Sequence, residues 1–242
     1  MSNENYIGIF DSGIGGLKTL EEIRKILPNE NYLYYADSKN NPYGEKEEKE
    51  LYDITKRIVS RLLNHNVKLI IIACNTATTK CIKKLRNEFS NTIFIGTEPA
   101  VKIACDNDYK NILVMATPTT IDSERMHILI DNNKKENQSI TLLKCDKLAN
   151  AIEQNNQKEI DIILKNIFKD KKNNNYDSIV LACTHYPYIK NKIQKIFPNA
   201  DIIDGNKGVS KRVKYILETN RIKNTSKTKG KIRIIKTRKV KK

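Results

Sequence analysis

Short apolar runs alternate with stretches of helical periodicity along this chain of 242 residues, and no other feature constrains its fold as strongly. In the helical stretches apolar residues recur every three or four positions, as they do from Leu17 to Leu27. Apolar runs that predict strands lie at residues 6–10, 32–36, 67–73, 91–96, 111–116, 140–144 and 178–182. Buried strands that alternate with helices are typical of a mainly parallel sheet covered by helices. The sequence therefore predicts an α/β fold.

The two halves of the chain resemble each other. Residues 70–76 (IIIACNT) are similar to residues 179–185 (IVLACTH), so that Cys183 follows Cys74 by 109 positions, and Ile7 aligns with Ile112. Internal similarity of this kind indicates repeated structural units. We therefore expect two related lobes that face one another, each with a mainly parallel sheet flanked by helices.

Charge is concentrated at one end of the chain. The formal net charge is +16, but residues 221–242 carry 11 basic and no acidic side chains, which leaves residues 1–220 with a net charge of +5. Lysine, isoleucine and asparagine fill 98 positions, a bias that adenine-rich codons produce without selection for charge. Two interpretations of this basic tail stay open: weak attraction to nucleic acid, or an exposed basic strand and end. Because the tail has no aromatic residue for base stacking, any such binding would be purely electrostatic.

Several protein classes are excluded by simple observations. The longest apolar run, Leu69–Cys74, is far shorter than the roughly 20 residues of a membrane span. The first residues have neither the basic nor the apolar part of a secretory signal. Five cysteines without a C-x-x-C pair argue against a disulfide framework. We expect a cytoplasmic protein that makes no contact with a membrane.

Two cysteines, Cys74 and Cys183, each follow a buried strand, after an alanine and before small polar residues where a helix is expected to start. In open α/β sheets the carboxyl ends of the strands form the ligand crevice. A thiol there lies near helix N-terminal amides, which lower its pKa from about 8.5. The alternative is a small buried hydrophobe, the usual state of an unpaired cysteine. Equivalent positions in two similar halves favour chemistry, whereas Cys81, Cys105 and Cys145 lack this context and are expected to be structural.

Two opposed thiols without a cofactor motif suit one kind of reaction. One thiolate can take a proton from one face of a carbon while the other thiol returns a proton to the opposite face, which inverts a stereocentre. A zinc site formed by Cys74, Cys183 and His185 is the competing hypothesis, but it lacks a fourth good ligand and C-x-x-C spacing. We therefore expect no metal and no cofactor.

A glycine-rich loop follows the first predicted strand. Residues 11–16 (DSGIGG) do not fit the dinucleotide pattern G-x-G-x-x-G, because Lys18 stands at the last glycine's place. The loop offers amides and the Ser12 hydroxyl at a helix start, which suit a charged amino-acid ligand. Asp11 either assists a neighbouring base or caps the helix.

Four motifs in this order and spacing resemble the glutamate racemase family: residues 10–17 (FDSGIGGL), 42–44 (PYG), 73–77 (ACNTA) and 183–187 (CTHYP). Residues 98–100 and the pattern of Thr117, Thr120 and Ser123 match secondary motifs of that family. The resemblance extends from about residue 6 to residue 210. It implies interconversion of L- and D-glutamate without a cofactor, in which the D-enantiomer is supplied for peptidoglycan synthesis.

The resemblance also implies a fold and a set of site residues. The fold is two α/β lobes, residues 1–98 with 205–242 and residues 99–204, with the active site in the cleft between them. Cys74 would accept the proton of the D-enantiomer and Cys183 that of the L-enantiomer. The implied catalytic residues are Cys74, Cys183, Asp11 and His185. The implied substrate-binding residues are Asp11, Ser12, Pro42, Tyr43, Gly44, Asn75, Thr76, Thr120, Thr184 and His185.

Some positions depart from the family pattern. Cys145 and Glu153 keep the family spacing without the two prolines between them, so no role is assigned to Glu153. Residues 231–236 resemble the family's last strand. The expected partners are L- or D-glutamate and, as an alternative to a monomer, a second copy of the chain. Two other functions stay open: a racemase that prefers aspartate or has broad specificity, and a basic module that binds nucleic acid.

Overall fold

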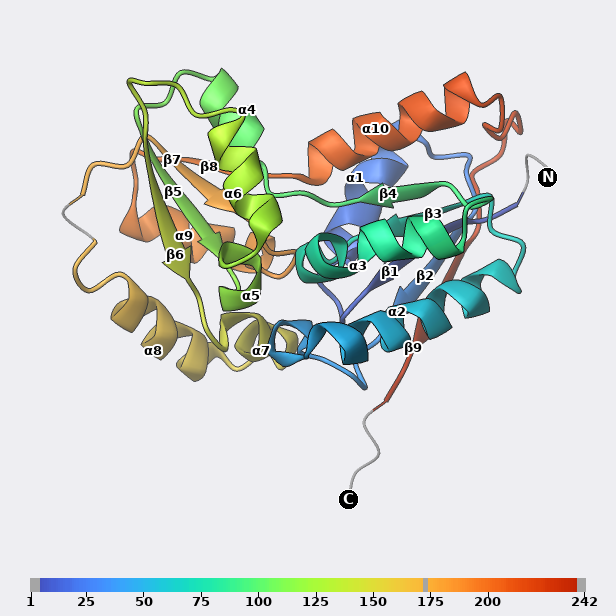
Figure 1. The fold of residues 1–242 in the computed structure, drawn as a ribbon, viewed down its shortest axis with the longest axis horizontal. Helices are drawn as coiled ribbons and strands as arrows, with labels where there is room; N and C mark the ends of the chain where they lie inside the picture. Colours follow the sequence, from blue (N-terminus) through green and yellow to red (C-terminus); the bar gives the residue numbers. More distant parts are fainter. Residues whose placement is uncertain (1–4, 172–173, 239–242) are drawn as a thin grey trace. The chain divides into compact units, whose positions relative to one another are not determined.

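The computed structural model describes residues 5–171 and 174–238 (Figure 1). The chain divides into two compact units, Met1–Thr97 with Asn206–Lys242 and Glu98–Gly205. Each boundary lies one residue from the position expected from the sequence. The last segment of the chain therefore belongs to the same unit as the first.

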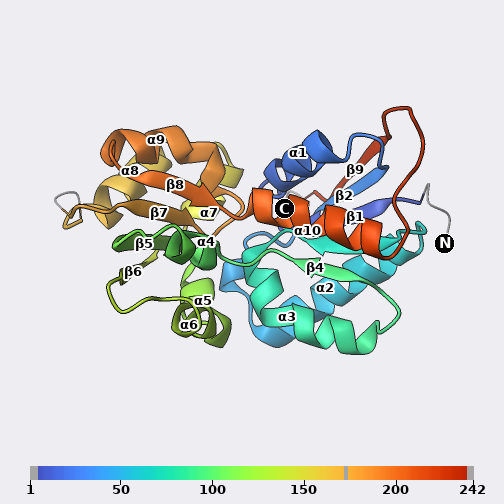
Figure 2. The same ribbon diagram turned by 90° about the horizontal axis from the view of Figure 1, so that it is seen from above.

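Five parallel strands form the sheet of the first unit, in the order β4-β3-β1-β2-β9. They are β1 (Ile7–Asp11), β2 (Tyr32–Ala36), β3 (Leu69–Ile72), β4 (Phe94–Gly96) and β9 (Ile232–Lys236). β1 lies between β2 and β3, with Ile9 opposite both Tyr34 and Ile71. β9 comes from the far end of the chain and pairs with β2 at the edge of the sheet (Figure 2).

Helices cover both faces of this sheet (Figure 1). Side chains alternate between the faces of a strand, so Ile7 and Ile9 of β1 point to one face and Phe10 to the other. The first face packs against α1 (Leu17–Ile26) and α10 (Asn206–Thr219). The second packs against α2 (Glu48–Leu63) and α3 (Asn75–Glu88). Since both faces are buried, the strands are apolar along their whole length, as is usual in parallel sheets.

The second unit has a four-stranded parallel sheet in the order β6-β5-β7-β8. Its strands are β5 (Asn111–Ala116), β6 (Ser139–Lys144), β7 (Ser178–Leu181) and β8 (Asp201–Asp204). One face is covered by α4 (Val101–Asp106), α5 (Pro118–Ile121) and α6 (Glu124–Asp131). The other is covered by α7 (Leu148–Glu153), α8 (Gln157–Ile167), the 3₁₀ turn η2 (Tyr186–Ile189) and α9 (Lys190–Ile196).

The two sheets share one topology. The order β8-β7-β5-β6 in the second unit corresponds strand by strand to β4-β3-β1-β2 in the first, and β9 extends only the first. The expected α/β fold of two similar lobes with mainly parallel sheets is therefore confirmed. β8 was not predicted, because only Ile202 and Ile203 separate its two aspartates and so short an apolar run carries little signal.

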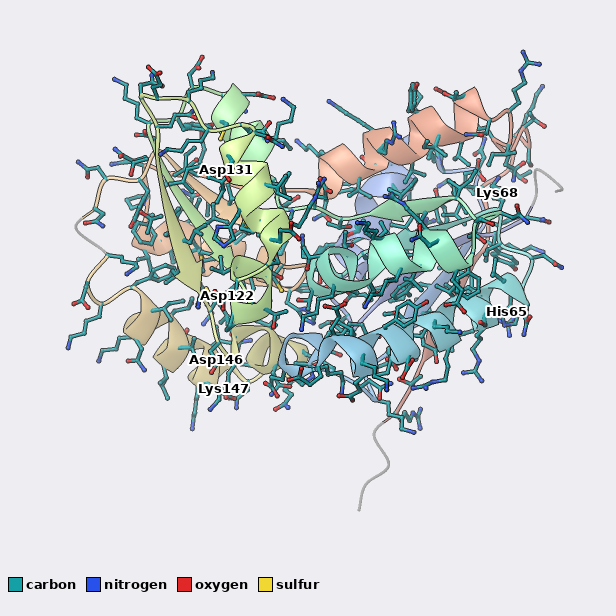
Figure 3. All side chains as sticks on the ribbon, in the orientation of Figure 1. His65, Lys68, Asp122, Asp131, Asp146 and Lys147 are labelled. Carbon is teal, nitrogen blue, oxygen red and sulfur yellow. The ribbon has the colours of Figure 1, made fainter. Side chains whose placement is uncertain are left out.

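A buried ion pair in the first unit holds the segment between α10 and β9 in place. Lys68, which precedes β3 and is labelled in Figure 3, holds its Nζ atom 2.6 Å from Oε2 of Glu30. The same ammonium donates to the carbonyl of Ile222 (2.8 Å), and Oε1 of Glu30 accepts from the amide of Asn224 (2.7 Å). The two charges thus hold the segment that leads into β9. Across residues 5–171 and 174–238, no helix combines the length and the apolar character that crossing a bilayer demands.

Candidate active site

Asp11 and Cys74 lie at the carboxyl edge of the first sheet. Asp11 is the last residue of β1, and Cys74 comes two residues after the end of the neighbouring parallel strand β3. The two strands stay in register up to Phe10 and Ile72. Asp11 is completely buried, and its Oδ2 accepts a hydrogen bond from the amide of Gly13 (3.1 Å). Helix α1 begins without a side-chain cap, so Asp11 orders the glycine loop rather than capping the helix.

The glycine loop passes very close to these strand ends. A Cβ atom at Gly16 would lie 2.8 Å from Cβ of Ala73 and 2.9 Å from Cβ of Asp11. Because real Cβ atoms do not approach so closely, only glycine fits here without movement of the backbone. The buried hydroxyl of Ser12 lies in the same loop.

Cys74 is the N-cap residue of α3, with an extended backbone and a side chain only 6% exposed. Its carbonyl accepts from the amide of Thr78 (2.9 Å). The N-terminus of a helix carries partial positive charge, which favours a thiolate over a thiol. Asn75 and Thr76 in the first turn are also buried, and the Asn75 amide donates to the carbonyl of Thr97 at the end of β4 (3.2 Å).

Tyr43 brings a hydroxyl to the same region. Its side chain is buried and donates to Oδ2 of Asp37, the residue that follows β2 (2.8 Å). Burial raises the pKa of Tyr43 well above its usual value, and the nearby carboxylate of Asp37 raises it further. Tyr43 therefore remains a neutral hydrogen-bond donor at physiological pH. Its neighbours Pro42 and Gly44 are half-buried.

The second unit holds a chain of three polar groups. Cys183, 8% exposed, has its Sγ atom 4.0 Å from Nδ1 of His185. Nε2 of the same imidazole lies 2.9 Å from Oε2 of Glu153. When Nε2–H donates to the Glu153 carboxylate, Nδ1 is left as the acceptor that faces the thiol. The arrangement can therefore take a proton from Cys183 and stabilise the imidazolium that results.

Glu153, whose role the sequence left open, contacts His185 in the structure. It is the last residue of α7, which starts after Lys147 (Figure 3), a residue with the left-handed φ of 57°. In this chain, which lacks the two prolines, the turn before α7 closes with Lys147 and with a bond from its amide to Oδ1 of Asp146 (2.9 Å). The spacing from Cys145 was the signal that could have identified Glu153.

The surroundings of the two cysteines differ in one respect from the expectation. Cys74 starts a helix of 14 residues, whereas Cys183 is followed by the four-residue 3₁₀ turn η2. In that turn the amide of Tyr186 bonds to the carbonyl of Cys183 (3.1 Å), with the tight spacing of a 3₁₀ segment. The prediction of a helix N-terminus is thus right for Cys74 and wrong for Cys183, where His185 is the neighbouring group.

Two threonines of the second unit are also among the predicted site residues. Thr184 is 6% exposed and lies between Cys183 and His185. Thr120, completely buried in α5 after β5, accepts a hydrogen bond from the Thr117 hydroxyl (3.0 Å). Since β5 and β7 are neighbouring parallel strands, Thr120 and Thr184 follow the same edge of the second sheet.

The predicted site residues thus fall into two sets, one in each unit. The first set comprises Asp11, Ser12, Pro42, Tyr43, Gly44, Cys74, Asn75 and Thr76, and the second comprises Thr120, Cys183, Thr184 and His185, joined by Glu153. Within the described part of the chain, no three His, Cys, Asp or Glu side chains gather as a metal site.

The other three cysteines are core residues, as expected. Cys81, Cys105 and Cys145 are buried. Burial raises the pKa of Cys81 to about 11 and raises the pKa of the Cys145 and Cys105 thiols as well. These thiols therefore stay protonated and unreactive at physiological pH.

Comparisons with known proteins agree with the motifs. A family model described as Asp/Glu/Hydantoin racemase matches residues 18–209. A glutamate racemase of Clostridium botulinum is 43% identical over 233 residues, which cover 95% of this chain and 90% of that protein. One of Clostridium acetobutylicum is 39% identical over 234 residues, with 96% and 91% covered. The solved structure of glutamate racemase from Francisella tularensis in complex with D-glutamate superposes with a TM-score of 0.83 at 28% identity, over 98% of this chain and 89% of that one.

Proposed function

This chain belongs to the Asp/Glu/hydantoin racemase family, and we propose that it interconverts L- and D-glutamate with two cysteine bases and no cofactor. One observation carries this proposal: a thiol follows the corresponding strand, β3 or β7, in each of two sheets of the same topology. Removal and return of a proton on opposite faces of a carbon needs two such groups. The similarity to glutamate racemases supports glutamate as the substrate.

The reaction balances with one proton in each direction. With L-glutamate, the Cys183 thiolate takes the proton from Cα, the C–H bond breaks, and the electron pair stays on the carbon, delocalised into the neighbouring carboxylate. The Cys74 thiol then gives its proton to the opposite face, and D-glutamate forms. Cys183 ends as a thiol and Cys74 as a thiolate, the state from which D-glutamate reacts in reverse. The mechanism requires both thiols to reach one substrate carbon from opposite sides.

The two thiols are served by different groups. The N-terminus of α3 stabilises negative charge on Cys74. The His185–Glu153 pair serves Cys183, where the imidazole accepts the thiol proton and the carboxylate stabilises the imidazolium. Asp11, at the end of the strand next to the one that leads to Cys74, is assigned to tune the Cys74 thiol.

The substrate needs donors for two carboxylates and an acceptor for its ammonium group. The hydroxyls of Ser12, Thr76 and Thr184, together with the Asn75 amide, supply donors, and Asp11 supplies negative charge for the ammonium. The Tyr43 hydroxyl, whose proton is donated to Asp37, lies beside these groups as part of the substrate-binding set. Thr120, Pro42 and Gly44 are the remaining residues that we assign to substrate binding. A site fitted to glutamate leaves the shorter distal carboxylate of aspartate away from its partners, and unpaired polar groups discriminate strongly.

A racemisation assay without added cofactor tests this proposal. We expect conversion of L-glutamate, with a kcat/KM higher than that for L-aspartate, and loss of conversion in Cys74→Ala and in Cys183→Ala. Cys105→Ala, which removes a thiol of the core, is the matched control and should retain activity. Near-normal turnover by either of the first two variants would overturn the mechanism, and a higher kcat/KM for aspartate would favour the aspartate-preferring alternative.

We place this reaction in the cytoplasm, as the supply of D-glutamate for peptidoglycan synthesis. A homodimer is an alternative to a monomer. Weak binding of nucleic acid by the basic tail stays a prediction; residues 239–242 of the tail lie outside the described residues, while Lys227, Lys229 and Arg233 are exposed. Binding of duplex DNA that persists at physiological salt and depends on base sequence would contradict a purely electrostatic attraction.

A further inference from the structure

A groove with a volume of about 540 Å³ runs between α2 and the ends of β2 and β9 in the first unit. Its floor includes the apolar side chains of Ile54 and Ile58 from α2 and the ring of Tyr35 from β2. Its rim carries three cationic side chains, Arg57, Arg61 and Lys39. None of these residues belongs to the racemase machinery described above.

The cations of the rim converge from two elements. Arg57 and Arg61 are one helical turn apart on α2, so they project from the same face. Nη1 of Arg61 donates to the hydroxyl of Tyr35 (3.2 Å), and its guanidinium carbon lies 6.0 Å from the centre of the Tyr35 ring. These two contacts orient Arg61 over the groove. Lys39 comes from the loop that follows β2.

The positive charge of this rim is not neutralised within the protein. Among the residues that the structure describes, no carboxylate or other acceptor bonds to the guanidinium of Arg57 or to Nζ of Lys39. Asp37 is the carboxylate that lines the groove, and its oxygens accept hydrogen bonds from Asn40, Tyr43 and Thr237. Since Asp37 is already satisfied, it does not pair with the arginines.

A second hollow continues along the same helix. Arg57 and Arg61 also line it, together with Lys56 and the carboxylate of Asp53. Lys56 is paired with Glu88, so among the cationic side chains that line this second hollow the two arginines, which border both hollows, are not paired with a carboxylate of the described part of the chain. The arginine pair is therefore accessible from two sides.

We propose that this groove binds a small anion that carries a phosphate or pyrophosphate group. Arginine guanidinium groups present parallel N–H donors in a rigid fork that matches phosphate oxygens. Two such forks one turn apart, with an ammonium group beyond them, suit neighbouring phosphate groups better than a single carboxylate. The site is distinct from the residues assigned to glutamate.

Calorimetric titration with inorganic pyrophosphate at low ionic strength tests the site. We expect saturable binding to the full chain and a dissociation constant at least tenfold higher for the Arg57→Ala/Arg61→Ala variant. Lys211→Ala/Lys214→Ala is the matched control, because it removes two exposed charges from α10 on the opposite face of the same sheet. This control should bind within twofold of the parent chain, and L-glutamate should not compete.

Three results would overturn the proposal. The first is that the parent chain shows no saturable binding. The second is that binding weakens equally in both double variants, which indicates general charge attraction. The third is that a chain that ends at Arg238 no longer binds. That shortened chain keeps every residue of the groove and removes only residues 239–242. If Arg57→Ala/Arg61→Ala does not fold, as judged by circular dichroism, Arg57→Gln/Arg61→Gln replaces it with the same expected loss.

Discussion

At the scale of single residues, the two proposed bases differ in what surrounds them. Cys74 caps a helix of 14 residues, and Cys183 faces an imidazole backed by a carboxylate. A helix N-terminus offers a fixed partial charge, whereas the imidazole of His185 is a group that can accept a proton and give it back. The second base is therefore the one whose strength depends on a third residue, Glu153.

The Glu153→Gln substitution tests that dependence. Glutamine keeps the size of the side chain, but a neutral amide does not stabilise the imidazolium, so proton transfer from Cys183 becomes less favourable. We expect kcat/KM to fall by about 10²-fold, at the lower end of what general acid–base groups contribute. Because the equilibrium constant between enantiomers is one, kcat/KM must fall equally in both directions.

The control for this variant is Glu136→Gln, which removes the same charge from an exposed position of the same unit. Both proteins should give the circular dichroism spectrum of the parent chain. Equal kcat/KM values in the two variants would show that Glu153 does not act on the reaction.

The residues that flank strand ends could be predicted from sequence, and their partners could not. Cys74, Cys183 and Asp11 stand directly after apolar runs, so a local pattern places them at a sheet edge. The contact between Glu153 and His185 joins positions 32 residues apart in the chain. Such a contact depends on how α7 packs against the 3₁₀ turn η2, which no local pattern encodes.

At the scale of elements, the first sheet depends on a strand that returns from the end of the chain. β9 pairs with β2 at the edge of the sheet, and the segment before it is held by the Lys68–Glu30 pair. The segment before β9 also passes very close to Glu30, since a Cβ atom at Gly230 would lie 1.9 Å from the carbonyl oxygen of Glu30. Strands β1 to β7 and β9 were predicted from apolar runs or from the family resemblance, and β8 was missed because its run is too short.

Replacement of Lys68 by methionine should destabilise the first unit strongly. Lys68 and Glu30 are both almost completely buried, and removal of one partner leaves the other charge unpaired, at a cost of about 3–5 kcal/mol. The Lys68→Met/Glu30→Gln double variant removes both charges and keeps an acceptor for the amide of Asn224, so it should be more stable than Lys68→Met alone. Urea unfolding at pH 7 measures both. A loss below about 1 kcal/mol for Lys68→Met would contradict the importance of the pair.

At the scale of the whole molecule, burial fixes the protonation of several acids. The pKa values of Tyr43, Tyr186 and Cys145 are raised by burial, and that of Cys81 is raised to about 11. A raised pKa in the folded state stabilises the fold below the pKa of the unfolded chain, and this contribution is lost as pH rises toward the folded value. Burial lowers the pKa of Lys68, so this group makes the fold more stable as pH rises. Its effect opposes that of the four acids named above, which together outweigh it.

We therefore expect the free energy of unfolding to fall between pH 9 and pH 11. Above pH 9 the thiols and then the phenols ionise in the unfolded chain while they remain neutral in the folded one. Urea midpoints at several pH values measure the slope, and Cys81→Ala should reduce it relative to the parent chain. A stability that is constant or rises over this interval would contradict the buried, neutral state of these groups.

The repeated topology gives each unit one thiol after a corresponding strand. The proposed chemistry needs each of these two thiols to accept or donate one proton. Racemisation of L-glutamate in D₂O tests this most directly. If Cys183 removes the proton and Cys74 returns another to the opposite face, the D-glutamate formed early carries deuterium at Cα, while the remaining L-glutamate carries almost none. Early deuterium at equal levels in both enantiomers, or D-glutamate that keeps the original proton, would contradict a mechanism with two separate bases.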